Sequence, residues 1–158
     1  MINYIDLSFK LLVGVFFLLV CYYDIVSRTI PNKLIFFIFI VLLARSILVT
    51  EDFNFNFNFN FNFNFNFNFI FFLLMTSIML ISYASGWFGG GDVKLIIAIS
   101  PFVTHGSEIL FLQIVGGAGL ILSFIFSLRR LNGNKTGHIE LPFGVAISTG
   151  FLFSVLLH

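Results

Sequence analysis

Six apolar runs make up most of this chain and restrict what it can fold into. Short polar stretches separate the runs, which cover residues 7–23, 34–49, 70–84, 93–103, 109–128 and 141–157. Most of them approach the ~20 residues that a helix needs to cross a bilayer. Only 9% of the residues are charged, whereas a soluble domain carries roughly 25%. The sequence therefore predicts an all-α membrane protein: a polytopic bundle of about six transmembrane helices, forming a single membrane-embedded domain over residues 1–158.

The rest of the composition excludes several classes of protein. A net charge of +1 argues against nucleic acid as a partner. Cys21 is the single cysteine, so an internal disulfide and a zinc site of paired cysteines are excluded; we expect no metal and no cofactor. The first run lacks a basic start and a small-residue cleavage site before position 30, so we expect a retained helix and not a removed signal peptide.

The positions of the basic residues predict the orientation, because cytoplasmic loops retain lysine and arginine. Six of the eight fall between alternate runs and so share one side: Arg28, Lys33, Lys94, Arg129, Arg130 and Lys135. Lys10 and Arg45 are left for the other side. We therefore expect a multi-pass protein of the inner membrane whose loops at 24–33, 86–92 and 129–140 face the cytoplasm.

A low-complexity tract of alternating phenylalanine and asparagine fills residues 53–69. Alternation would place every phenylalanine on one face of a strand, but a lone strand cannot span lipid, and eight asparagines make a poor spanning helix. We expect an insertion in an external or interfacial loop, which a protein tolerates at little thermodynamic cost. An adhesive, self-associating segment is the functional alternative.

Two aspartates are the strongest candidates for chemistry, because ionisable residues at membrane depth are costly to keep. Asp24 ends the first run and Asp92 opens the fourth. Two crossings lie between them, so we expect both carboxyls at the same membrane boundary, close enough for a water bridge. Each aspartate also has a structural explanation: Asp92 as an N-cap, and Asp24 as an interfacial charge near Arg28.

A pair of carboxyls can hydrolyse a peptide bond without a metal. Like-charge repulsion makes two neighbouring carboxyls share one proton; the ionised member then activates water while the protonated member polarises the scissile carbonyl. Gly89, Gly90 and Gly91 precede Asp92, and they permit positive φ angles and a close approach of a substrate strand.

Other ionisable and nucleophilic side chains are weaker candidates. Lys94 could neutralise a substrate carboxylate, although a lysine that reaches out of the membrane to water is an ordinary alternative. Cys21 lies one helical turn before Asp24, but no nearby histidine offers it a base. We expect His105, His138 and His158 to be solvated.

Three ordered motifs resemble those of the type IV prepilin peptidase family. The segment 24–32, Asp-Ile-Val-Ser-Arg-Thr-Ile-Pro-Asn, resembles the family's first-aspartate segment and ends on Pro31 and Asn32. The segment 89–95, Gly-Gly-Gly-Asp-Val-Lys-Leu, is similar to its GxGD motif, and Leu141-Pro142-Phe143-Gly144 to the opening of its last helix. Pro31 also suits a helix start, and Gly144 close helix packing.

The resemblance implies an aspartic endopeptidase with Asp24 and Asp92 as its catalytic pair. Its partners would be prepilin or pseudopilin precursors held in membrane lipid, cleaved after a glycine on the cytoplasmic side. The chain lacks the paired cysteines and the methyltransferase region of larger members, and so resembles the short peptidases of tight-adherence (Flp) pilus systems.

Two functions of other classes would also explain intramembrane acids. A small ion-coupled or proton-coupled transporter would use them as cation sites, although it would normally place them nearer the midplane. An inactive membrane scaffold for pilus assembly would not need them for chemistry. Loss of precursor cleavage in Asp24→Asn would separate the peptidase from both.

Overall fold

Every regular element in the described part of the chain is helical. The computed structural model describes residues 2–49, 69–103, 106–131 and 142–156. In these residues the helices are α1 (Ile2–Ser27), α2 (Asn32–Val49), α3 (Phe69–Ala84), α4 (Gly90–Ile99), the 3₁₀ turn η1 (Ser100–Phe102), α5 (Glu108–Leu131) and α6 (Phe143–Leu156). The predicted all-α bundle is confirmed. The Phe-Asn tract up to Asn68 lies outside the described residues.

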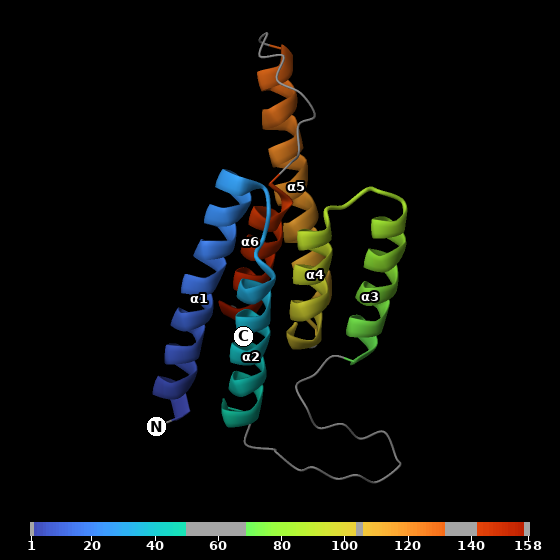
Figure 1. Ribbon diagram of the computed structural model, residues 1–158. Coiled ribbons are helices and arrows are strands. Elements are labelled where there is room, and N and C mark those ends of the chain that lie inside the picture. Colours follow the sequence, from blue (N-terminus) through green and yellow to red (C-terminus); the bar gives the residue numbers. More distant parts are fainter. Residues whose placement is uncertain (1, 50–68, 104–105, 132–141, 157–158) are drawn as a thin grey trace.

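The helices pack around α4 and α6, which lie inside the bundle. α6 contacts α1, α4 and α5, and α2 packs between α1 and α4. α3 lies at the edge against α4 and η1 (Figure 1). Because α1 and α6 are neighbours, residues at opposite ends of the sequence can share one site.

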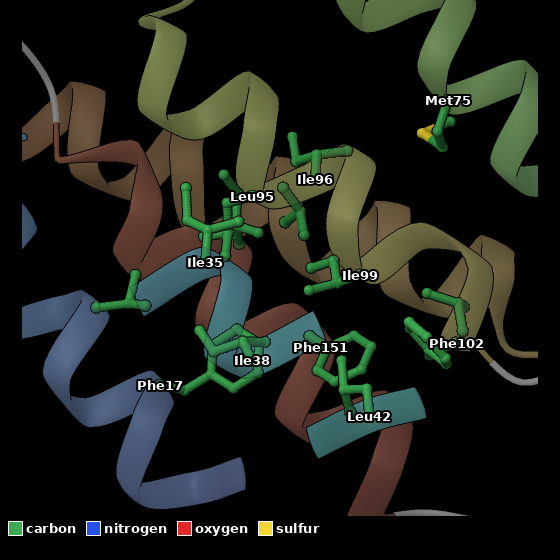
Figure 2. Packing of buried hydrophobic residues seen from close by; sticks show 14 of the residues in the cluster. Phe17, Ile35, Ile38, Leu42, Met75, Leu95, Ile96, Ile99, Phe102 and Phe151 are labelled. Carbon is green, nitrogen blue, oxygen red and sulfur yellow. The ribbon is translucent and has the colours of Figure 1, made fainter. Parts of the chain in front are cut away.

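The core is built from one face of each inner helix. In α1, Val13, Phe17 and Val20 are at most 1% exposed, and their spacing of four and three residues keeps them on one side of the helix. The Phe17 ring packs against Phe151 of α6, with ring centroids 5.2 Å apart (Figure 2). This stripe sets the rotation of α1 and so decides where the rest of its buried face points.

The helices differ in length. Tyr4–Ser27 in α1 and Glu108–Ile125 in α5 are long and apolar enough to cross a membrane. α3 and α6 have 16 and 14 residues, or about 24 and 21 Å at 1.5 Å per residue, against a hydrocarbon core of ~30 Å. The short helices fit a bilayer that is locally thinned, or cross only part of it.

The shortest helix is α4, as the sequence predicts, although its bounds differ. It begins at Gly90, three residues before the expected start at Val93, and ends at Ile99. Pro101 lies in the first turn of η1, where its missing N–H and its ring prevent an α-helix from continuing. α4 is therefore about 15 Å long, and its first turn is at the end of the bundle where α1 finishes (Figure 1).

Gly150 allows the closest contact between α5 and α6. A Cβ at Gly150 would clash with Cγ2 of Val115 and would lie 3.2 Å from the carbonyl oxygen of Phe111. Membrane helices use such small residues to approach one another, because packing drives their association. Because two of the neighbouring atoms are backbone atoms of α5, the two helices would have to move apart to accommodate a side chain at Gly150.

We expect Gly150→Ala to lower the free energy of unfolding by about 1–3 kcal/mol, the usual cost of overpacking. Unfolding of the detergent-solubilised protein by denaturant measures the change. Gly14→Ala is the matched control, since no atom lies within 4 Å of its added Cβ. Equal stability of the two variants would contradict the tight α5–α6 contact.

Candidate active site

The three motif segments meet at one end of the bundle. The C-terminal end of α1 and the N-terminal ends of α4 and α6 lie at this end (Figure 1). Asp24 is in the last turn of α1 and Asp92 in the first turn of α4. Both aspartates therefore lie at the same end of the bundle, which we call the aspartate end.

Asp24 continues the buried stripe of α1. It follows Val20 by four residues, and the whole residue is 4% exposed. The backbone N–H of Val145 donates to Asp24 Oδ2 at 3.3 Å, and the N–H of Gly144 also points to this carboxyl. These are first-turn donors of α6, where N–H groups and the helix dipole stabilise an anion; the Val145 N–H is shared with the carbonyl of Pro142, also at 3.3 Å. Asp24 thus joins α1 to α6. Its burial argues against the alternative in which Asp24 is a solvated charge at the membrane interface, although the Arg28 charge does act on its carboxyl.

The absence of a side chain at Gly144 allows the Asp24 carboxyl to lie against α6. A Cβ at Gly144 would lie 2.9 Å from Asp24 Oδ2 and 3.0 Å from Cδ1 of Ile30. Any side chain at this position would have to displace the carboxyl or the isoleucine. The predicted role of Gly144 in close packing therefore extends to the aspartate itself.

Asp92 is a half-buried residue of the first turn of α4. The cap of this helix is Gly89, which makes no side-chain hydrogen bond, and Asp92 is the third helical residue. The alternative in which Asp92 is an N-cap is therefore wrong. An acid in the first turn is still stabilised by the helix dipole, and that interaction leaves both carboxyl oxygens open to other partners.

Ile30 packs between the starts of α4 and α6. Its side chain would contact an added Cβ at Gly91 of α4, at 3.4 Å, and at Gly144 of α6, at 3.0 Å. The Asp24 charge acts on the Asp92 carboxyl. The structure therefore places the two predicted site residues at one end of the bundle, within reach of each other's charge.

An aromatic pair ties the glycine loop to the start of α6. The rings of Phe88 and Phe143 meet edge to face, with centroids 4.9 Å apart. Phe143 also fills the space that Gly119 of α5 leaves, since a Cβ there would lie 2.7 Å from its ring. Phe88 and Gly119 belong to none of the motifs found in the sequence. The small residues at 116–119 were the sequence signal for the contact of Gly119 with Phe143.

The glycine run does not adopt the backbone conformation that its sequence permits. Gly89 has φ −67° and ψ 145°, and Gly90 and Gly91 are the first helical residues of α4. Positive φ occurs instead at Gly86, with φ 73°, where it ends α3 as Gly commonly does. Gly90 and Gly91 instead lie close to Tyr83 and Ile30, at 3.5 and 3.4 Å from an added Cβ, and Gly89 is the exposed residue of the three.

Lys94 points away from the aspartate pair. It follows Asp92 by two residues, which turns it about 200° around the helix. Its Nζ donates to Oδ1 of Asn32 at 3.1 Å. The carbonyl of Pro31 accepts from the backbone N–H of Leu34, so Pro31 and Asn32 form the start of α2, as their sequence predicts.

Cys21 lies on the same side of α1 as Asp24. Its thiol is half-buried and forms a hydrogen bond with Ser148 of α6. His105, His138 and His158 lie outside the described residues.

Comparison with known proteins identifies the family. The model of the type IV leader peptidase family matches residues 11–124, more than half of the chain. The chain belongs to the type IV leader peptidase family. The match covers Asp24 and Asp92. The Pro142–Gly144 motif lies beyond the matched residues, and the contacts of Asp24 with Gly144 and Val145 join it to the site. No curated protein and no solved structure matches the chain. The protein is thus a membrane protein of a protease family.

Proposed function

We propose that this leader peptidase is an aspartic endopeptidase that removes the leader of type IV or Flp prepilins, with Asp24 and Asp92 as its catalytic pair. The observation that carries the proposal is the placement of two carboxyls from α1 and α4 at one end of the bundle, near enough for one charge to act on the other. Asp92 does not cap its helix. The N–H groups of α6 that bond Asp24 could be satisfied by an uncharged acceptor, so a structural role alone does not account for an acid at this position.

The chemistry follows from the pair sharing one proton. The ionised carboxyl accepts a proton from water as the water attacks the scissile carbonyl carbon, and the protonated carboxyl donates to the carbonyl oxygen. Collapse of the tetrahedral intermediate returns a proton to the leaving amine. Both products leave with the carboxyls restored, so the reaction needs no further group from the protein.

Access and orientation support a substrate that approaches from the cytoplasm. Gly89, Gly90 and Gly91 leave backbone without side chains beside Asp92. Arg28, Lys33 and Lys94 lie at the aspartate end, whereas Lys10 and Arg45 lie at the other end, where both pair with Asp6. This asymmetry favours a multi-pass protein of the inner membrane with the aspartate end inside. The glycine loop then faces the compartment in which a leader is exposed.

Cleavage of a candidate prepilin tests the proposal. Purified protein and precursor, reconstituted together in lipid vesicles, should give a shortened pilin whose new N-terminus, identified by mass spectrometry, follows a glycine. A chelator should leave the rate unchanged, since the proposed mechanism needs no metal. No shortened product from any prepilin of a type IV or Flp system would contradict the proposal and favour a transporter or a scaffold.

Deletion of residues 55–68 should preserve at least half of the cleavage rate per folded protein. The ends of α2 and α3 that this segment joins are at the end of the bundle opposite the aspartate end (Figure 1). Rates of the deleted and full-length proteins, each normalised to its amount in the membrane, give the measurement. A deleted protein that accumulates normally but no longer cleaves would show that the segment takes part in function.

A further inference from the structure

An apolar groove runs between α2 and α4 on the outside of the bundle. Its α2 wall is one helical face, at spacings of three and four residues, and its α4 wall is two residues one turn apart. The lining residues are Asn32, Ile35, Phe36, Phe39, Lys94 and Ala98. The groove holds about 300 Å³ and opens outward. Ala98 creates the space, because a larger side chain there would fill the gap between the two helices.

The two ends of the groove differ in chemistry. At the aspartate end, Lys94 Nζ meets Asn32 Oδ1 at 3.1 Å, and both residues are exposed. The positive end of the α2 dipole adds to the lysine charge here. At the inner end, the Phe39 ring packs against Phe102 with centroids 5.6 Å apart. A cation therefore marks the mouth, and aromatic side chains close the groove about 10 Å further along α2.

We propose that this groove binds an anionic phospholipid, with the phosphate on Lys94 Nζ and part of one acyl chain between α2 and α4. Among the lining residues Lys94 is charged and none is acidic, so the mouth selects an anion. A cationic pocket between helices at the membrane boundary is the usual setting for such headgroups. The inference does not depend on the peptidase chemistry.

Charge favours a lipid over the other apolar occupant, the stem helix of a substrate. The groove combines a cation at its mouth with an apolar lining, which matches the phosphate and the acyl chain of one phospholipid. A single acyl chain is thin enough to enter between Ile35, Phe36 and Ala98.

Native mass spectrometry of the full-length protein, exposed to equal amounts of phosphatidylglycerol and phosphatidylcholine, tests the proposal. We expect one phosphatidylglycerol to be retained about fivefold over phosphatidylcholine, the preference that one lysine near the headgroups supplies. Lys94→Gln should abolish the preference, and Lys94→Arg should restore it. Lys33→Gln is the matched control, because Lys33 is exposed one residue from Asn32 and does not line the groove.

A second variant tests the acyl chain separately from the charge. Ala98→Phe should reduce retention of both lipids at least fivefold, whereas Ala84→Phe, at an exposed site on α3, should not. Equal retention of the two lipids by the wild type, equal effects of Lys33→Gln and Lys94→Gln, or normal retention by Ala98→Phe would each overturn the proposal. So would a photocrosslinker at position 36 that captures a prepilin while no lipid is retained.

Discussion

Asp24→Asn and Asp92→Asn should each leave a folded membrane protein that cleaves a prepilin about 10²–10⁴-fold more slowly than the wild type. Asparagine is nearly isosteric with aspartate, and its amide oxygen can still accept the Val145 N–H that Asp24 accepts now. What the amide cannot do is exchange a proton with water or with the scissile carbonyl. The loss should therefore appear in kcat, measured as the rate of leader removal from a saturating precursor.

Glu108→Gln is the control for this pair. It changes an acid to its amide in the first turn of α5, at the opposite end of the bundle from the aspartates, and should cleave at the wild-type rate. Full cleavage by either asparagine variant would remove that residue from the catalytic assignment. A transporter or a scaffold would give no cleavage with the wild type either.

Gly144→Ala should reduce cleavage about 10²-fold, the usual cost of displacing a reacting group by roughly 1 Å. The added Cβ would lie 2.9 Å from Asp24 Oδ2, so the carboxyl must leave its hydrogen bond with the start of α6. Ile30, 3.0 Å from the same Cβ, limits movement of the backbone in the other direction. Steady-state cleavage rates, with unfolding followed in parallel, measure the effect.

Gly117→Ala is the matched control for Gly144→Ala. No atom lies within 4 Å of its added Cβ, and it should leave cleavage and stability unchanged. A Gly144→Ala protein that cleaves at the wild-type rate would mean that Asp24 can react from a position away from α6. The contact with Val145 would then be structural only.

The sequence predicts the helices well, because apolar runs report membrane burial directly. Their ends are less predictable. The apolar run at 93–103 continues through Pro101, whereas the α-helix ends at Ile99 and gives way to a 3₁₀ turn. The run at 141–157 begins before α6, which starts at Phe143. α3 covers the whole run at 70–84, and that run is itself shorter than a full span.

The candidate site could be predicted in part. Apolar residues four and seven positions before Asp24 place it on the buried face of α1, and two crossings place Asp92 at the same end. The contacts of Asp24 with α6 could not be predicted from the sequence, because they depend on how α1 and α6 pack. A backbone N–H such as that of Val145 leaves no signal in the sequence. The run Gly89–Gly91 permits positive φ without requiring it, and positive φ occurs instead at Gly86.

The most direct test of the central claim is the cleavage rate of the double variant Asp24→Asn, Asp92→Asn beside the two single variants. If the carboxyls share a proton and act as one unit, losing either stops the reaction, and the double variant should be within about threefold of the slower single variant. Losses that multiply, so that the double variant is slower by the product of the two single effects, would contradict the account, because the two aspartates would then act independently.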